Sequence, residues 1–311
     1  MQMFDNILTL LVNNTGYFYA TVILLSLVVG SFLNVVIHRL PIMMEKEWIC
    51  ECREYLADEL KPSESKPDEL KLGEEGQQAP DEVYNLSLPR SACPKCGHKI
   101  TALENIPLVS WLVLRGKCSG CQAPISMRYP LVELLTAVLS VIVAAHFGPT
   151  PLTLLYIVLT WGLVALTFID LDTMLLPDQI TLPLLWLGLL ASVWGLGISP
   201  TAAIVGSCVG YLSLWSVYWL FKLLTGKEGM GFGDFKLLAV FGAWLGWQSI
   251  LLIVLLSSFV GAIFGVFIIY QQKKGKNTPI PFGPYIAIAG WIALLWGDPI
   301  IDFYLQQFVY R

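Results

Sequence analysis

The chain has 311 residues, of which 56% are hydrophobic and only 14% are charged. Soluble domains carry about 25% charged residues, so this composition excludes an ordinary soluble protein. The charges are also concentrated, because residues 39–128 hold 12 of the 19 Lys and Arg and 14 of the 23 Asp and Glu. We therefore expect a membrane protein with a polar insert. The net charge of −4 and the absence of a basic arm argue against a nucleic-acid partner.

Apolar segments long enough to cross a bilayer recur along the chain, since a hydrocarbon core of about 30 Å needs about 20 helical residues. One apolar run, 237–270, is too long for a single span, and the polar pair Gln248–Ser249 divides it. Its first part can cross only if the span begins near Met230, which draws Asp234 and Lys236 into the membrane or to its edge. The expected spans are 17–38, 129–148, 151–170, 180–197, 200–222, 230–248, 249–270 and 281–297.

Lys and Arg residues lie in alternate connections between these eight spans. They concentrate in 39–128, in 222–236 and at Lys273, Lys274 and Lys276, whereas the intervening turns have none. All of these connections then lie on one side of the membrane, which the positive-inside rule makes cytoplasmic. Both termini are expected on the opposite side. The sequence thus predicts an all-α polytopic membrane protein with three regions: a first span (1–38), a cytoplasmic insert (39–128) and a membrane domain of about seven spans (129–311).

Four cysteines of the insert form two C-x2-C pairs separated by 21 residues. Each pair turns two thiolates towards one point, and four thiolates form the tetrahedral set that zinc prefers. A metal would also stabilise an insert too small to have a core of its own. We expect structural zinc here, with two unliganded reduced pairs as the alternative; His98, which follows the first pair, is expected near the site but not as a ligand. The predicted ligands are Cys93, Cys96, Cys118 and Cys121.

Residues 43–82 are strongly acidic, with 13 acidic and 5 basic side chains. Such a segment is either a solvated linker or a surface that attracts a basic partner.

Two carboxylates are expected at similar depths in the membrane. If the third helix extends to Leu176, Asp170 lies about 9 Å inside its end, and Asp234 lies about 6 Å inside a span that begins near Met230. Charged groups at membrane depth are costly and usually functional. We expect Asp170 and Asp234 to meet as a pair near the cytoplasmic face. Asp178, which follows a helix-ending proline, is expected to cap the next helix.

A close pair of carboxylates shares one proton and can hydrolyse a peptide bond: the ionised acid takes a proton from water, and the protonated acid donates to the scissile carbonyl. Gly231 and Gly233 precede Asp234 and leave room for another backbone. The same pair could instead relay protons in a proton-coupled transporter. These residues alone support both interpretations equally.

Several motifs in order resemble the type IV prepilin peptidase family, and the resemblance covers nearly the whole chain. Gly231–Asp234 reads GFGD, a GxGD motif, and Asp170 is followed after six residues by Pro177–Asp178. The other matching segments are 30–41 (GSFLNVVIHRLP), the cysteine pairs followed by 125–133 (ISMRYPLVE), and 281–284 (PFGP). GxGD alone is shared with presenilin-like proteases, an alternative that the cysteine pairs and the N-terminal segment argue against.

The resemblance implies a bifunctional enzyme of the bacterial inner membrane with both termini in the periplasm. It would remove the basic leader of type IV prepilins or type II secretion pseudopilins, then methylate the new N-terminal residue with S-adenosylmethionine. Asp170 and Asp234 would be the catalytic acids, with Asp172 as the alternative first acid. The family places this acid seven residues before the proline, which favours Asp170. The long acidic segment 43–82 departs from the family's common core, and it would attract a basic leader.

Further residues have both a functional and a structural interpretation. Glu133 either binds the substrate amine or supports catalysis, or it is a paired structural charge. Lys236 either tunes Asp234 or extends to the membrane interface. Gly30, Asn34 and Arg39 are candidates for binding S-adenosylmethionine, although no Gly-rich strand-turn-helix is present. Their structural alternatives are helix packing, an interhelical hydrogen bond and anchoring of the topology, respectively.

Overall fold

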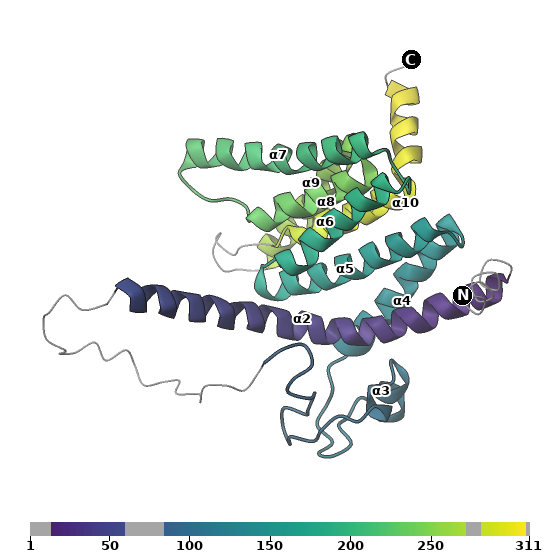
Figure 1. Cartoon of the computed structure of the whole chain (residues 1–311), viewed down its shortest axis with the longest axis vertical. Helices are drawn as coiled ribbons and strands as arrows, with labels where there is room; N and C mark the ends of the chain where they lie inside the picture. Colours follow the sequence, from purple (N-terminus) through teal and green to yellow (C-terminus); the bar gives the residue numbers. More distant parts are fainter. Residues whose placement is uncertain (1–13, 60–83, 272–280, 309–311) are drawn as a thin grey trace, which may run out of the picture.

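The structure is a computed structural model, and it describes residues 14–59, 84–271 and 281–308. Every regular element in these residues is helical (Figure 1), so the predicted all-α class is confirmed. The long elements are α2 (Thr15–Glu59), α4 (Arg128–Phe147), α5 (Pro151–Thr173), α6 (Asp178–Val193), α7 (Pro200–Thr225), α8 (Phe232–Leu245), α9 (Trp247–Gln271) and α10 (Gly283–Phe308). The insert holds the short η1 (Leu103–Asn105) and α3 (Val109–Val113).

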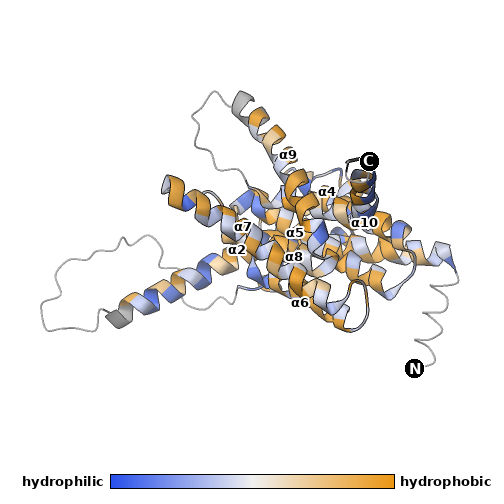
Figure 2. Cartoon of the chain, turned by 90° about the horizontal axis from the view of Figure 1, so that it is seen from above, coloured by the Kyte–Doolittle hydropathy of each residue, from blue (hydrophilic) through white to orange (hydrophobic). Residues whose placement is uncertain are grey.

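Six of these helices are long and apolar enough to cross a membrane, namely α2, α4, α5, α7, α9 and α10. Hydrophobic residues predominate along most of these helices (Figure 2), as expected of a multi-pass membrane protein. The helices α6 and α8 have 16 and 14 residues. Their lengths of about 24 and 21 Å are below the hydrocarbon thickness of about 30 Å. The predicted number of eight spans therefore stays a prediction.

Two helices extend beyond the expected spans. Helix α2 has 45 residues, about 68 Å of helix, and continues past the expected end of the first span at residue 38. Residues 43–59 of the acidic segment are therefore helical, and residues 60–83 lie outside the described residues. The end of α2 projects beyond the other helices and is mostly hydrophilic (Figures 1 and 2). The part of α10 nearest the C-terminus runs in a different direction from the rest of the helix (Figure 1), and α10 contains Pro299, which removes a backbone hydrogen bond.

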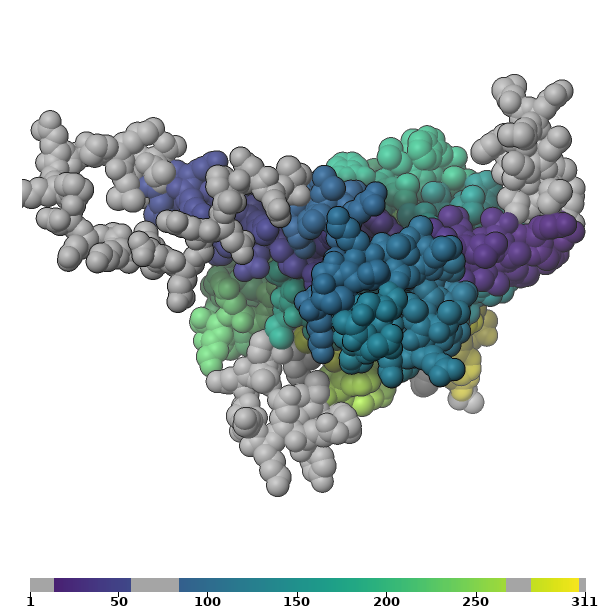
Figure 3. Space-filling view, turned by 90° about the horizontal axis from the view of Figure 1, so that it is seen from below, coloured from purple at the N-terminus to yellow at the C-terminus, as the bar shows by residue number. Residues whose placement is uncertain are grey.

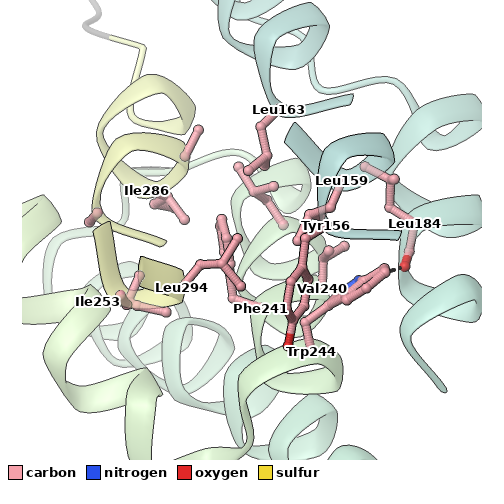
Figure 4. Packing of buried hydrophobic residues seen from close by; sticks show 14 of the residues in the cluster. Tyr156, Leu159, Leu163, Leu184, Val240, Phe241, Trp244, Ile253, Ile286 and Leu294 are labelled. Atoms are coloured by element: carbon pink, nitrogen blue, oxygen red, sulfur yellow. Dashed lines mark hydrogen bonds between the residues drawn. The ribbon is translucent and has the colours of Figure 1, made fainter. Parts of the chain in front are cut away.

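Helix α8 lies at the centre of the membrane domain, and ten of its residues are buried. Side chains from α5, α6, α9 and α10 pack around it (Figure 4), and Trp244 Nε1 donates to the carbonyl oxygen of Leu184 in α6 over 2.9 Å. Helix α7 contacts α8 through backbone, since a Cβ at Gly206 would overlap the carbonyl group of Gly242. Such small-residue contacts are typical of membrane helices. This packing holds the start of α8 in place.

Candidate active site and metal centre

Asp170 lies in the last turn of α5, and only 4% of it is exposed. Helix α5 ends at Thr173 because Met174 adopts a left-handed conformation (φ 57°) and its N–H donates to the carbonyl oxygen of Asp170. The helix does not reach Leu176, so the expected depth of about 9 Å is wrong, and Asp170 lies about 4.5 Å from the helix end. Asp170 is thus a buried acid at a helix terminus.

Asp234 lies in the first turn of α8 and is 7% exposed. The preceding Gly231 is extended (φ −80°, ψ 149°), and the helix begins at Phe232. Asp234 is therefore about 3 Å inside the helix, less than the expected depth of about 6 Å. The N–H of Asp234 donates to the carbonyl oxygen of Gly231 over 3.3 Å, which closes this first turn. Both acids consequently lie nearer to helix ends than the sequence indicated.

The fold brings these two acids together. The charge of the Asp170 carboxylate acts on Asp234, although the two acids belong to different helices, α5 and α8. A third helix end meets them there, because the N–H of Gly283, the first residue of α10, donates to Asp170 Oδ2 over 3.0 Å. In the parts of the chain that are described, no basic side chain forms an ion pair with either acid. The arrangement is that of two buried carboxylates that cannot both ionise at low cost.

The two glycines of the GxGD motif have different surroundings. A Cβ at Gly233 would lie 2.7 Å from the Cβ of Leu176, so this glycine permits close packing of the loop between α5 and α6. A Cβ at Gly231 would meet only Asp234 Oδ2, at 3.9 Å. The expectation that these glycines leave room for another backbone therefore fits Gly231, whereas Leu176 fills the space at Gly233.

Asp172 and Asp178, the other acids of this region, have basic partners. Arg128 at the start of α4 donates to both carboxylate oxygens of Asp172, over 2.9 and 2.5 Å. Lys236 donates to both oxygens of Asp178 over 2.7 Å. The expectation that Asp178 caps α6 is wrong, because it is the first helical residue and its side chain makes no capping bond. Lys236 is held by Asp178, and Asp170 is the acid that interacts with Asp234.

The four cysteines of the insert form one cluster. The Sγ atoms of Cys93 and Cys121 are 3.8 Å apart, those of Cys96 and Cys118 are 3.9 Å apart, and all four lie within 4.8 Å of one another. Tetrahedral zinc with Zn–S bonds of about 2.3 Å requires sulfur separations of about 3.8 Å. The cluster therefore fits a zinc ion, and its four predicted ligands converge.

The two cysteine turns of the cluster have the same backbone design. The N–H of Cys93 donates to the carbonyl oxygen of His98 (2.9 Å), and the N–H of Cys118 donates to that of Ala123 (2.8 Å). The residue after each second cysteine, Gly97 or Gln122, has a positive φ of 70° or 59°. In the first turn, the N–H groups of Lys95 and Cys96 donate to Cys93 Sγ and lower the pKa of that thiol to about 6, whereas contacts with neighbouring thiols, Cys121 first, raise the pKa of the Cys96 thiol to about 12. The shared backbone geometry of the two turns thus directs their four sulfur atoms to one point.

A polar network beside the cluster includes His98, which does not belong to the four-sulfur group. His98 Nε2 lies 3.2 Å from the Glu104 carboxylate and 3.1 Å from Ser119 Oγ. The Ser119 hydroxyl, followed by the N–H and hydroxyl of Thr101, donates to Glu104 and lowers the pKa of its carboxyl to about 2. The sequence did not reveal Glu104, whose bonds connect the two cysteine turns.

Arg39 and Glu133 attach the insert to the membrane helices. The buried Arg39 of α2 donates to the carbonyl oxygens of Asn85 (2.9 Å) and Pro89 (2.6 Å). The buried Glu133 of α4 accepts the N–H of Leu108 over 2.8 Å. Figure 3 shows residues 84–128 of the insert packed as one body against α2. Asn85, Pro89 and Leu108 belong to the insert, and Glu133 also forms a side-chain hydrogen bond with Ser31 of α2.

Gly30 and Asn34 lie where α2 packs against α4. A Cβ at Gly30 would be 2.8 Å from the Cα of Glu133, so only glycine permits this helix contact. Asn34 Nδ2 donates to the carbonyl oxygens of Gly30 (3.3 Å) and Tyr129 (3.1 Å). These contacts match the structural interpretations of both residues, helix packing and an interhelical hydrogen bond.

Replacement of Arg39 should loosen the insert. Arg39→Ala removes two charge-assisted hydrogen bonds worth about 1.5–3 kcal/mol each, so residues 84–90 should become susceptible to protease while the zinc content stays unchanged. Arg39→Lys should be intermediate, because one ammonium replaces the two-pronged guanidinium. Limited proteolysis in detergent would measure this, with the exposed Arg53→Ala on α2 as the control. Equal protection in the Arg39→Ala and control proteins would contradict this role.

Comparisons with known proteins identify the family of the chain. The model of the Bacterial Peptidase A24 N-terminal domain matches residues 24–147, and that of the Type IV leader peptidase family matches residues 157–266.

Proteins named prepilin leader peptidase/N-methyltransferase are similar to this chain over nearly their whole length. The one from Aeromonas hydrophila is 61% identical over 94% of this chain and 95% of its own. Those from Aeromonas salmonicida and Pseudomonas aeruginosa are 60% and 58% identical over 93% of this chain and 94% of theirs. No solved structure gives a significant match. Given these matches over both halves, the chain belongs to the type IV leader peptidase family.

Proposed function

We propose that this protein removes the leader peptide of type IV prepilins or type II secretion pseudopilins and then methylates the new N-terminal residue. The observation that carries the proposal is the buried Asp170–Asp234 pair, which lacks a basic partner among the described residues. Relatives that share about three fifths of the sequence are named for the same two activities. The names of these relatives also favour a peptidase over a proton-coupled transporter.

In this proposal the two carboxylates catalyse hydrolysis together. One ionised acid takes a proton from a water molecule, which attacks the scissile carbonyl, while the other acid donates its proton to the carbonyl oxygen. No covalent intermediate forms between the enzyme and the peptide. Burial of both acids excludes competing water and keeps one proton on the pair. The open side of Gly231 next to Asp234 is where we place the substrate backbone.

We further propose eight spans in the bacterial inner membrane, with both termini in the periplasm. The short helices α6 and α8 would count as spans within the protein interior, where packing against other helices replaces contact with lipid. The basic connections and the insert would then face the cytoplasm. This places the dyad, at the end of α5 and the start of α8, near the cytoplasmic face, where a leader would arrive.

The cysteine cluster would hold a structural Zn²⁺, with all four thiolates as ligands and no open position for catalysis. S-adenosylmethionine would supply the methyl group. The residues predicted to bind it, Gly30, Asn34 and Arg39, make packing contacts or hydrogen bonds to neighbouring elements. These contacts do not fit a cofactor site, and we derive no methyl-transfer step through them.

The projecting end of α2 would attract the basic part of the leader. Its glutamates Glu45, Glu47, Glu51 and Glu54 are all exposed. Replacing the four by glutamine should raise the KM for a leader rich in Lys or Arg several-fold at low salt. The difference should shrink above ~0.1 M salt, where the Debye length falls below about 10 Å. Steady-state cleavage would measure this, with Asp302→Asn on α10 as the control. A KM equal to that of the control at low salt would favour the linker interpretation.

The proposed function is tested by incubating the purified protein in detergent with a prepilin and S-adenosylmethionine. Mass spectrometry should show loss of the leader and, on the shortened chain, the addition of one methyl group. An intact prepilin after incubation with the wild-type protein, under conditions where the Pseudomonas aeruginosa relative cleaves it, would overturn the proposal.

A further inference from the structure

Gly283 brings the start of α10 into contact with Asp170. Its N–H donates to Asp170 Oδ2 over 3.0 Å, and both residues are buried. A Cβ at this position would lie 2.6 Å from the same Oδ2 atom. Real Cβ atoms do not approach an oxygen that closely, so any side chain would push the carboxylate or the helix away. The hydrogen bond in its present form therefore requires glycine.

Leu176 connects this contact to the other half of the site. A Cβ at Gly283 would lie 3.1 Å from both terminal methyl groups of Leu176, and a Cβ at Gly233 would lie 2.7 Å from its Cβ. Leu176 thus packs between Gly283, which contacts Asp170, and Gly233, which precedes Asp234 in the sequence. The loop after α5 consequently packs against the start of α8 and the start of α10 at the same point.

The N–H of Gly283 is one of the first N–H groups of a helix, which have no partner within the helix and carry partial positive charge. Because an N–H can only donate, Asp170 Oδ2 must be the acceptor in this bond. The proton shared by the pair then resides on Asp170 Oδ1 or on Asp234. The bond therefore fixes the orientation of the Asp170 carboxylate. It also leaves Oδ1 as the Asp170 oxygen that can accept or donate a proton.

We propose that Gly283 is a positioning residue for peptide hydrolysis: its N–H orients the Asp170 carboxylate towards Asp234, and its missing side chain makes this contact possible. The inference rests on the proposed function of the dyad, because it assigns Gly283 a role in that reaction. It concerns a residue more than a hundred positions from Asp170 in sequence.

The test compares Gly283→Ala with wild-type protein in the prepilin cleavage assay. We expect kcat to fall about 100-fold, the effect of a displacement of about 1 Å at a catalytic group, while KM changes less than twofold. The acidic limb of the pH–kcat profile should also move to higher pH, because a donor to the carboxylate stabilises its ionised form. A purely structural role would leave the position of this limb unchanged.

Gly297→Ala is the matched control, since it lies on the same helix and its Cβ would meet only the Cβ of Ala293, at 3.7 Å. The Leu176→Ala variant and the Gly283→Ala/Leu176→Ala pair remove the apolar contact and leave the contact with Asp170. If the double variant regains the kcat of Leu176→Ala, the effect is loop packing and the inference is overturned. The inference is supported if the double variant stays as slow as Gly283→Ala.

Failure of the inference and failure of the proposed function give different results. Cleavage by the wild-type and Gly297→Ala proteins establishes the peptidase in the same experiment. Near-normal kcat of a folded Gly283→Ala protein, with unchanged elution and melting temperature, would then overturn the positioning role alone. If Gly283→Ala does not fold, the double variant decides, because loss of the Leu176 side chain makes room for the added methyl group.

Discussion

Asp170→Asn and Asp234→Asn should each abolish prepilin cleavage, with kcat at least about 10³-fold below wild type. The expected loss is large because general acid–base catalysis alone contributes about 10²- to 10⁴-fold, and an amide can neither take a proton from water nor donate one as an acid. Asparagine has nearly the size of aspartate, so the packing of α5, α8 and α10 should survive. Single-turnover cleavage in detergent would measure the loss, and an unchanged melting temperature would show that the variants are folded.

The matched variant for this experiment is Asp172→Asn. Asp172 is the alternative first acid by sequence, but its carboxylate is held by Arg128 and its side chain is 39% exposed. We expect this variant to keep most of the activity, since an exposed ion pair contributes only about 0–1 kcal/mol. Near-normal cleavage by Asp170→Asn together with loss of activity in Asp172→Asn would move the catalytic role to Asp172. Near-normal cleavage by Asp234→Asn would refute the dyad.

Cys118→Ser should remove the metal from the insert. Cys118 is the buried member of the cluster, and a hydroxyl replaces the thiolate that zinc requires. Structural zinc sites in small modules supply much of their folding free energy, about 10–16 kcal/mol of apparent binding in zinc-finger peptides. The insert should therefore unfold locally, while the membrane helices, which have their own core, stay folded.

Elemental analysis of the purified proteins would measure this, with about one zinc per wild-type chain expected for a four-thiolate site and far less in Cys118→Ser. Protease should cleave the insert of the variant faster than that of the wild type. Cys208→Ser is the control, because Cys208 is exposed on α7 and belongs to no cysteine cluster. Unchanged zinc content in Cys118→Ser would remove the four-thiolate site.

The four acids in this region differ in whether they have a basic partner. Asp172 pairs with Arg128 and Asp178 pairs with Lys236, and each pair joins two helices. Asp170 and Asp234 have no such partner in the described ranges, although both are more deeply buried. Burying an unpaired acid in a membrane domain costs free energy, so such an acid usually has a functional role. Pairing therefore distinguishes the two ion-paired acids from the two proposed catalytic acids better than depth does.

The sequence by itself determined the helical class, the membrane association and the residues of the candidate sites. Hydrophobic runs of about 20 residues that cross a bilayer must form helices, because only a helix gives every backbone N–H and C=O group of such a run a hydrogen-bond partner. The two C-x2-C pairs predict a four-thiolate cluster. The GxGD segment and Asp170 were evident because charges are rare outside residues 39–128. All of these signals are local, in composition or in short spacing.

Only the tertiary structure decided the partners and the exact ends of the helices. The hydrogen bond from Gly283 to Asp170 joins residues 113 positions apart, and Arg39 reaches the carbonyl group of Pro89 50 positions away. No local pattern records such contacts, because they depend on how separate helices pack. The end of α5 likewise depends on the left-handed Met174, whose conformation its residue type does not favour. The sequence thus predicts which acids are unusual, and the packing of three helix ends decides that two of them form a pair.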